Sequence, residues 1–542
     1  MNIKRAKEEI KNAVEAYLWK DEFGNYEIPA VRQRPILLMG PPGVGKTQIM
    51  EQVAKECGIG LVAYTITHHT RQSAVGLPMI ERRTYGGKDY AVTEYTMSEI
   101  VGAVYNKMAS TGLTEGILFI DEINCVSETL APAMLQFLQC KTFGTHRIPE
   151  GWLIVAAGNP PEYNKSVREF DIVTLDRIRR IDVEPDAAVW KEYAVQENIH
   201  PAVIAYLDIK KQNFCRIETT VDGPRFVTPR SWEDLSRLVG VYEKMNKPVD
   251  RDVVIQYLQY PNIAKDFANY LALYNKYQED YQIDEILAGR IREGVYDKLA
   301  RAAFDERLSM VGLLFSRLNG RFSEINMQEA VMQRLMEILR RFQEQGECRT
   351  SNGQETGDVR MDVNAGMNIG VGIDAAGDLA DDMADNAADS AMNNLAVKRL
   401  SELIQETENN WETLKKQELL TRKEDVIYRK VLEKLEHYRR CFYAWKGQKE
   451  NICAWDFLRE QFGTDSDRFE EQCEQAGQML EYAFDFMEAA FGDSQEMVMF
   501  ITELNSHASC AAFLQEYDCA RYYEYNQRLL FDEREREFLR KD

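Results

Sequence analysis

A glycine-rich stretch near the N-terminus has the residue types and spacing of a phosphate-binding loop. Its residues are Gly40, Pro41, Pro42, Gly43, Val44, Gly45, Lys46 and Thr47. They follow an apolar run and precede a helical pattern that starts at Gln48. Such glycines let backbone N–H groups turn inward, and the positive end of the next helix favours phosphate. Lys46 is expected to reach the β- and γ-phosphates of a nucleotide, Thr47 to hold Mg²⁺, and Gln48 to complete the nucleotide site.

Three polar side chains follow apolar runs that are typical of buried strands. Asp121 and Glu122 end the run at 116–120, and Asn159 ends the run at 152–158. Ligands of open α/β sheets bind at the carboxyl ends of strands. Asp121 is expected to place Mg²⁺ through water, Glu122 to activate the attacking water as general base, and Asn159 to orient that water. The alternatives are a core strand that ends in surface acids and an asparagine that caps a turn.

Arginines at two places along the chain are candidates for stabilising phosphoryl transfer. Arg177, Arg179 and Arg180 lie near a short β-like run at 181–183, and Arg230 lies at the start of a later helical segment. An arginine supplied across a subunit boundary would stabilise the charge that develops in the transition state. Arg230 is expected to point back at the γ-phosphate and couple a lid to nucleotide state. A solvated basic face or a surface ion pair is the alternative.

The elements that must position these side chains alternate between strand and helix over residues 1–184. An amphipathic helix is predicted at 3–19, a hairpin at 79–95, and a second hairpin or a loop at 141–150. Short apolar strands separated by helices predict a P-loop NTPase core, an α/β domain whose mainly parallel sheet has helices on both faces. The chemistry is then expected at one edge of this sheet.

The rest of the chain is predicted to be mostly α-helical. From Pro185 the β-like runs stop, which predicts a helical lid at 185–290, where Ser231 caps a helix with Asp234 three residues on. A helical extension is expected at 291–350. Residues 351–394 hold nine acids, one base and no aromatic residue, which predicts a flexible acidic linker. The predicted helical C-terminal domain, 395–542, shows no motif that indicates its role.

Composition limits the classes of partner. The 542-residue chain has a net charge of −22, which argues against a nonspecific grip on nucleic acid or on an anionic membrane. Its ten cysteines include no Cys-x-x-Cys pair, so neither a disulfide framework nor a zinc site is indicated. No apolar run approaches the roughly 20 residues that span a bilayer, and the start lacks the apolar block of a signal peptide. A cytoplasmic location is expected.

Residues 30–245 resemble the AAA+ ATPases, specifically the MoxR-type branch with its NorQ/CbbQ-like relatives. The matching motifs occur in family order: Walker A at 40–47, Walker B at 117–122, sensor 1 at Asn159, the finger segment at 175–180 and sensor 2 at Arg230. The hairpin at 79–95 is similar to the family's insert in helix 2, and the stretch 137–160 to its hairpin before sensor 1.

This resemblance implies a homo-oligomeric ring, a hexamer, with ATP and Mg²⁺ bound between subunits. It favours Arg177 as the trans-acting finger, although Arg179 and Arg180 leave that choice open. It also implies an enzyme, an ATP hydrolase with a chaperone-like role in remodelling or activating a client protein, in some cases one with a von Willebrand factor A domain. The alternatives are a nucleic-acid motor or restriction-type NTPase or GTPase on the same core, and a nucleotide-gated scaffold that does not hydrolyse.

Overall fold

The computed structural model describes residues 1–68, 71–143, 145–163, 167, 170–220, 223–344, 384–445 and 454–539. The chain divides into two compact units. The first unit comprises Met1–Ser323, Leu414–Thr421 and Gln475–Asp542, and the second comprises Glu324–Thr413 and Arg422–Glu474. Most of the predicted acidic linker, 351–383, lies outside the described residues. The domain boundaries drawn from the sequence remain a prediction.

A five-stranded parallel sheet forms the centre of residues 1–184, in the strand order β2-β5-β8-β1-β9. Its strands are β1 (Ile36–Met39), β2 (Gly60–Thr65), β5 (Gly116–Asp121), β8 (Trp152–Gly158) and β9 (Arg179–Asp182). The predicted parallel sheet is therefore confirmed. Because the strands are parallel, β1, β5 and β8 all direct their carboxyl ends to the same edge.

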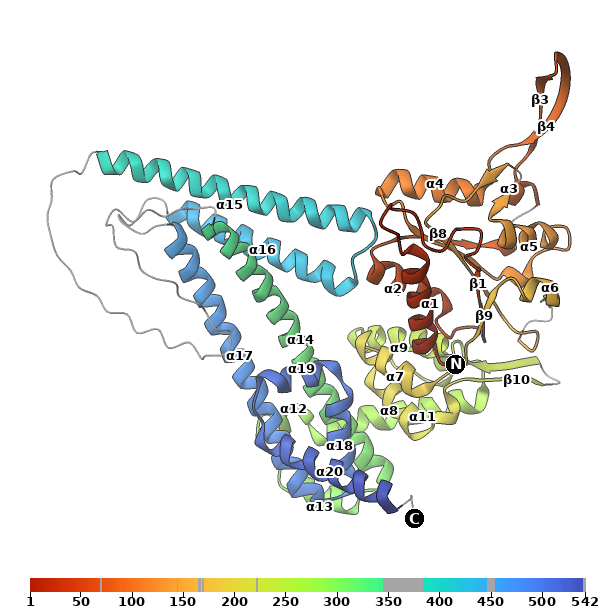
Figure 1. Ribbon diagram of the computed structural model, residues 1–542. Coiled ribbons are helices and arrows are strands. Elements are labelled where there is room, and N and C mark those ends of the chain that lie inside the picture. The colour runs from red at the N-terminus through yellow and green to blue at the C-terminus, as the bar shows by residue number, and fades with distance from the viewer. Residues whose placement is uncertain are drawn as a thin grey trace. The chain divides into compact units, whose positions relative to one another are not determined.

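Helices cover both faces of this sheet (Figure 1). Successive strand side chains alternate between the faces, so Leu38 and Phe119 join one core while Leu37 and Leu118 join the other. The first face is covered by α1 (Ile3–Leu18) and α2 (Lys46–Cys57), and the second by α4 (Glu99–Thr111) and α5 (Ala131–Cys140). The short elements around them are η1 (Ile66–His68), α3 (Arg71–Val75), η2 (Ile123–Cys125) and α6 (Ile172–Leu175).

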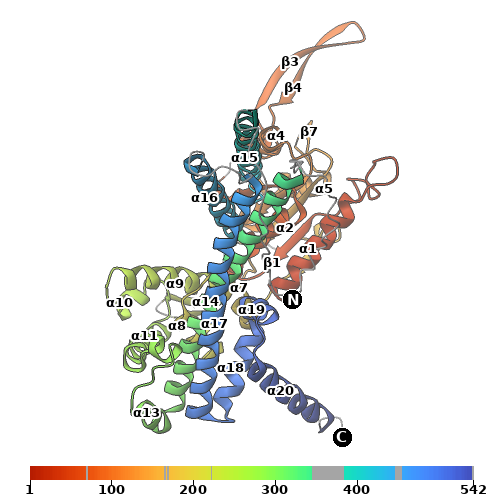
Figure 2. The same ribbon diagram turned by 90° about the vertical axis from the view of Figure 1, so that its left-hand side faces the viewer.

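Two hairpins interrupt this core, as the sequence predicted. Strands β3 (Pro78–Tyr85) and β4 (Lys88–Tyr95) pair between α3 and α4, and the two views show this ribbon extending away from them (Figures 1 and 2). Gly86 and Gly87 connect them, both with positive φ (58° and 82°), as a tight hairpin turn requires. The shorter hairpin is β6 (Thr142–Phe143) with β7 (His146–Arg147), which precedes β8.

The segment after Pro185 is largely helical, but the expectation that it contains no strand is wrong. Strands β10 (Arg216–Thr220) and β11 (Gly223–Val227) form an antiparallel hairpin. Each strand is only five residues long, so its alternation is too short to stand out from a loop. The helical elements here are α7 (Ala187–Gln196), α8 (Pro201–Ile209), η3 (Lys211–Asn213), α9 (Pro229–Lys244), α10 (Arg251–Val254), α11 (Pro261–Tyr281), α12 (Ile283–Leu287) and α13 (Val295–Arg301).

The cap of α9 also differs from the prediction. Thr228, not Ser231, is the N-cap, and the Oγ1 atom of Thr228 accepts the backbone N–H of Ser231 at 3.3 Å. Ser231 returns the contact by accepting the N–H of Thr228 at 2.8 Å. Pro229 is well suited to the first helical position, where no backbone donor is needed, so the helix begins earlier than predicted.

Long helices form the remaining part of both units. They are α14 (Phe304–Glu344), α15 (Ala384–Lys416), α16 (Arg422–Trp445), α17 (Ala454–Phe491), α18 (Gln495–Ser506), α19 (Ala508–Glu516) and α20 (Ala520–Leu539). In the second unit, α15 and α16 share an apolar core with the parts of α14 and α17 that belong to it, which includes Leu335, Leu400, Leu435 and Leu458. Among the described residues, no helix is both long and apolar enough to cross a membrane.

Candidate nucleotide site

The glycine-rich loop connects the buried end of β1 to the first residue of α2. Gly43 and Gly45 have φ of 78° and 94°, values that a residue with a Cβ atom rarely adopts. Gly40 is needed for a different reason, because a Cβ atom there would lie 2.6 Å from the carbonyl oxygen of Val183. The loop therefore brings its backbone close to β9 and turns directly into the N-terminal end of α2, the arrangement that favours a bound phosphate.

Lys46 is the central polar contact of the site. Its Nζ atom donates to the carbonyl oxygens of Gly40 at 2.7 Å and Pro41 at 3.0 Å, and to Oδ1 of Asn159 at 2.9 Å. The residue is only 8% exposed. The structure thus brings together Lys46 and Asn159, which are 113 positions apart and were both predicted to act at the terminal phosphate.

Burial lowers the pKa of Lys46 to about 8, although nearby Asp121 raises it, and Arg230 lowers it further. Anionic phosphates favour the charged amine, so ATP binding should raise this pKa. We therefore expect ATP affinity to fall as the pH rises from 7 to 9, by up to about tenfold per unit once the free lysine is neutral. Calorimetric titration at both pH values measures this, with Lys46→Met as the variant that lacks the dependence. Equal affinity of the unmodified protein at both values would contradict the expectation.

Thr47 and Asp121 are the two side chains predicted to serve the metal, and they are in contact. Thr47 Oγ1 donates to Asp121 Oδ2 at 3.1 Å. A hydroxyl and a carboxylate oxygen are the hard donors that Mg²⁺ prefers, so these residues fit the ion. Within the described ranges, no group of three or more acidic, histidine or cysteine side chains is placed to bind a metal. Phosphate oxygens and water would have to complete the coordination, as is usual for Mg²⁺.

Glu122 follows Asp121 at the end of β5 in a left-handed backbone conformation, with φ of 58°. A non-glycine residue adopts this conformation at a cost of order 1 kcal/mol, and such strain tends to occur at functional sites. The backbone N–H of Glu122 donates to Oδ1 of Asp121 at 2.9 Å, which holds the turn. The charge of Glu122 also raises the pKa of Lys46, so the two side chains are within electrostatic reach.

Asn124 is a residue of the site that our sequence analysis missed. It is 3% exposed, and its Nδ2 atom donates to the backbone oxygen of Asn159 at 2.8 Å. Its Oδ1 atom has no hydrogen-bond partner in the part of the chain that the structure describes. A Cβ atom at Gly158 would lie 2.6 Å from that oxygen, so the glycine makes room for it. The signal in the sequence was an asparagine two positions after the second of the two acids.

The three arginines of the finger segment lie away from the chain's own phosphate-binding loop. In the parallel register Arg179 pairs with Ile36, at the end of β1 opposite to the loop. Arg179 forms an ion pair with Glu9, and Arg180 forms one with Asp182 at 2.8 Å. Arg177 is exposed and donates to Oε1 of Gln139 at 2.6 Å. None of the three is therefore paired with the loop of its own chain.

Arg230 lies beside the loop. A Cβ atom at Gly43 would be 3.2 Å from Cβ of Arg230 and 3.0 Å from the hydroxyl oxygen of Thr228. The side chain of Arg230 is exposed, and its charge lowers the pKa of Lys46. The start of α9 therefore lies against the phosphate-binding loop.

A cavity of about 190 Å³ adjoins the loop and was not predicted from the sequence. It is lined by α1, the start of α2, α7 and α9, with apolar walls from Val44, Ile49, Val189 and Trp190. Gln48 contributes at its edge. The Nε2 atom of Gln48 donates to the hydroxyl of Tyr193 at 3.1 Å, and that hydroxyl donates to Glu233 at 3.1 Å. Finding this cavity required knowing that the lid packs against α1 and α2.

Comparison with known proteins agrees with this geometry. Residues 36–174 match the family model described as "ATPase family associated with various cellular activities (AAA)". No curated protein matches the sequence. Many solved structures are similar to parts of the chain.

Among these structures, a protein of Cytophaga hutchinsonii, provisionally assigned as an ATPase, is 16% identical with a TM-score of 0.20. The alignment covers 33% of this chain and 52% of that protein, so the chain spans about half of its length. A proline-to-glycine variant of RuvB from Thermotoga maritima is 15% identical with a TM-score of 0.28, over 47% of this chain and 69% of that one. These likenesses are too weak to inform function.

Proposed function

We propose, from the AAA-family domain at residues 36–174, that this chain is an ATPase that couples ATP hydrolysis to the remodelling or activation of another protein. The observation that supports it best is the convergence of three strand ends. Lys46 Nζ lies 2.9 Å from Asn159 Oδ1, and Thr47 Oγ1 lies 3.1 Å from Asp121 Oδ2. These are the contacts expected of side chains that share one terminal phosphate and its metal.

In the proposed mechanism each side chain has one task. Lys46 and the loop N–H groups bind the phosphates. Thr47 and Asp121 would hold Mg²⁺, which when bound would neutralise charge on the phosphate oxygens. Glu122 accepts the proton of the attacking water while the water oxygen bonds to the γ-phosphorus and the bond to the β-γ bridging oxygen breaks. Asn159 aligns that water. Arg177 stabilises the developing charge from a neighbouring subunit.

The base of the nucleotide is proposed to occupy the cavity beside the loop. Its wall is partly apolar, with Val44 and Trp190, and partly polar, with Lys4 and Glu192. Gln48 offers an amide at its edge. Because Val189, Trp190 and Tyr193 lie on the lid, a bound base would contact both the lid and α2. Together with Arg230 at the phosphate end, this gives the lid two contacts that depend on the nucleotide and provides a route from hydrolysis to movement.

The finer assignment to the MoxR-type branch is supported by the hairpin inserted between α3 and α4. All of β3 is exposed, including Met79 and Ile80, which are 50% and 80% exposed. The ribbon exposes these apolar side chains beside charged ones such as Arg82 and Lys88, and such a mixed surface is suited to contacts with another protein. We propose that the chain forms a hexameric ring. We also propose that its substrate is a separate client protein, of which a protein with a von Willebrand factor A domain is one candidate.

Replacing Asn124 tests the support of Asn159. We expect Asn124→Ala to lower kcat for ATP by about tenfold, because a buried hydrogen bond worth about 1 kcal/mol or more is lost. The KM for ATP should change less than twofold, since Asn124 contacts the backbone oxygen of Asn159 and not the nucleotide. Steady-state phosphate release measures both constants. A change in KM with an unaltered kcat would refute a positioning role. Asn124→Gln is expected to recover little of the lost kcat, because Asn124 already lies tightly against Gly158 and a longer side chain would not fit there.

Mixing variants tests whether Arg177 acts across a subunit boundary. Arg177→Ala should lower turnover roughly 10³-fold while leaving ATP affinity nearly unchanged. When the Arg177→Ala protein is mixed with the Lys46→Ala protein, the first supplies an intact loop and the second an intact Arg177. Some subunit boundaries then join the two, so ATPase activity should partly return. The control is Arg180→Ala, which removes a neighbouring arginine already paired with Asp182. If the mixture is as inactive as its components, action in trans is ruled out.

A further inference from the structure

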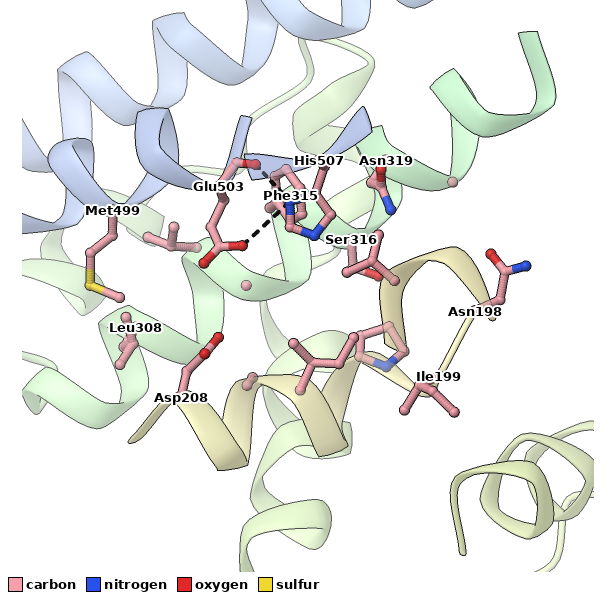
Figure 3. A pocket seen from close by; sticks show the side chains of 17 residues that line it. Asn198, Ile199, Asp208, Leu308, Phe315, Ser316, Asn319, Met499, Glu503 and His507 are labelled. Atoms are coloured by element: carbon pink, nitrogen blue, oxygen red, sulfur yellow. Dashed lines mark hydrogen bonds and ion pairs between the residues drawn. The ribbon is translucent and has the colours of Figure 1, made fainter. Parts of the chain in front are cut away.

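A second cavity in the first unit lies far along the chain from the phosphate-binding loop. It has a volume of about 210 Å³ and is lined by residues of α7, α8, α14, α18 and the turn before α19 (Figure 3). Most of its wall is apolar, with Ile204, Leu308, Val311, Phe315 and Met499 among the lining residues. Nothing in the proposed ATPase mechanism uses this cavity.

Two carboxylates at this cavity share a single lysine. Lys191 Nζ lies 2.9 Å from Asp208 Oδ2 and 2.5 Å from Glu503 Oε1. Both acids line the cavity, whereas Lys191 is not among its lining residues. Burial raises the pKa of Asp208 and the charge of Glu503 raises it too, whereas Lys191 and, more weakly, Lys211 lower it. The formal charges of Lys191, Asp208 and Glu503 sum to −1 when all three are ionised.

His507 does not supply the missing charge. It is 4% exposed, and its Nδ1 atom lies 2.7 Å from the backbone oxygen of Glu503, so Nδ1 carries the proton. Burial lowers the pKa of His507, which keeps the ring neutral at pH 7. Its ring packs against Phe315 with centroids 4.4 Å apart. Nε2 is then an acceptor, and the described residues offer it no hydrogen-bond donor.

We propose that this cavity binds a small organic cation that carries an ammonium group on an apolar body of about benzene size. The ammonium would pair with Glu503 and Asp208 and donate to Nε2 of His507, while the body would fill the space beside Phe315 and Met499. The size is sufficient, because an apolar cavity of roughly 150 Å³ can hold benzene. Glu503 and Asp208 are partly buried and outnumber Lys191, so an anionic ligand is disfavoured and a neutral one leaves the charge uncompensated.

Binding here is positioned to influence the lid. Helix α7 lines this cavity with Val195 and lines the cavity beside the phosphate-binding loop with Val189 and Tyr193. A cation that orders α7 against α14 and α18 would change the free energy of any lid movement that shifts α7. Reciprocity then requires that nucleotide and cation alter each other's affinity. This coupling rests on the proposed ATPase function, whereas binding of the cation does not.

Calorimetric titration of the full chain with benzylammonium, benzyl alcohol and benzoate tests the proposal. We expect saturable one-to-one binding of benzylammonium, at least about tenfold weaker binding of benzyl alcohol, and none of benzoate. Equal binding of the amine and the alcohol would overturn the charge assignment, and the absence of amine binding would overturn the site. Neither outcome bears on ATP turnover, so the two proposals fail separately.

Three variants locate the binding. Glu503→Gln should weaken benzylammonium at least about tenfold, whereas Glu496→Gln should not. Glu496 is a matched control because it is a buried acid of the same helix, paired with Arg307 at 3.2 Å and absent from the cavity wall. Ala205→Leu should block the cavity without touching its charges. Unaltered binding in both Glu503→Gln and Ala205→Leu, each shown to be folded by thermal melting, would overturn the proposal.

Discussion

The Glu122→Gln protein is expected to bind ATP with nearly unchanged affinity but to release phosphate roughly 10²–10⁴-fold more slowly. Glutamine has almost the shape of glutamate, so the left-handed turn at φ of 58° and its N–H contact to Asp121 should persist. What is lost is the base that accepts the proton of the attacking water. A coupled phosphate-release assay at saturating ATP measures the rate, and calorimetric titration measures the affinity.

Glu128→Gln is the matched control for this variant. Glu128 is an exposed acid in the segment after β5, six positions after Glu122. Its replacement by glutamine should leave turnover unchanged. Normal hydrolysis in Glu122→Gln would remove the general base from the proposed mechanism. Loss of ATP binding together with turnover would instead place Glu122 in the binding of nucleotide.

The Lys46→Ala protein is expected to lose ATP affinity by about 2–5 kcal/mol, or roughly 30- to 5,000-fold, because a desolvated cation that faces the phosphates is removed. The loop should keep the left-handed backbone at Gly43 and Gly45, although it loses the contacts of Lys46 Nζ with the carbonyl oxygens of Gly40 and Pro41. Burying Lys46 lowers its pKa, so its removal should not destabilise the protein strongly. Titration with a non-hydrolysable ATP analogue measures the loss.

Lys55→Ala is the control for Lys46→Ala. Lys55 lies in the last turn of the same helix, α2, and is well away from the loop. The Lys55→Ala protein should bind the ATP analogue as tightly as the unmodified protein does. If Lys46→Ala retained full affinity while thermal melting showed it to be folded, the nucleotide would have to bind elsewhere.

The parts of the site that could be predicted are those that local rules determine. The loop requires glycine at Gly43 and Gly45 because of backbone conformation, and this requirement is visible in the sequence. Asp121 and Asn159 each end a fully apolar run, and parallel strands bring such ends to one edge. These two rules predict that Lys46, Asp121 and Asn159 lie at one edge of the sheet. Which side chains touch depends on the strand order, in which β1 neighbours β8 and not β5.

The features that were missed depend on packing between distant segments. Asn124 supports Asn159 only because η2 and the end of β8 come within hydrogen-bond distance. The base cavity exists because α7 packs near α1, more than 160 positions earlier in the chain. The carboxylate cluster joins Lys191 to Glu503, 312 positions away, and no spacing rule in the sequence connects them.

Phosphate release from ATP by the purified full chain, with Mg²⁺ present and after its removal by chelation, decides whether this chain is a Mg²⁺-dependent ATPase. We expect steady turnover with Mg²⁺, return to background with the chelator, and recovery when Mg²⁺ is restored. ATP hydrolysis at this site is contradicted if the folded protein releases no phosphate with Mg²⁺, or if the rate is the same in the Lys46→Ala and unmodified proteins.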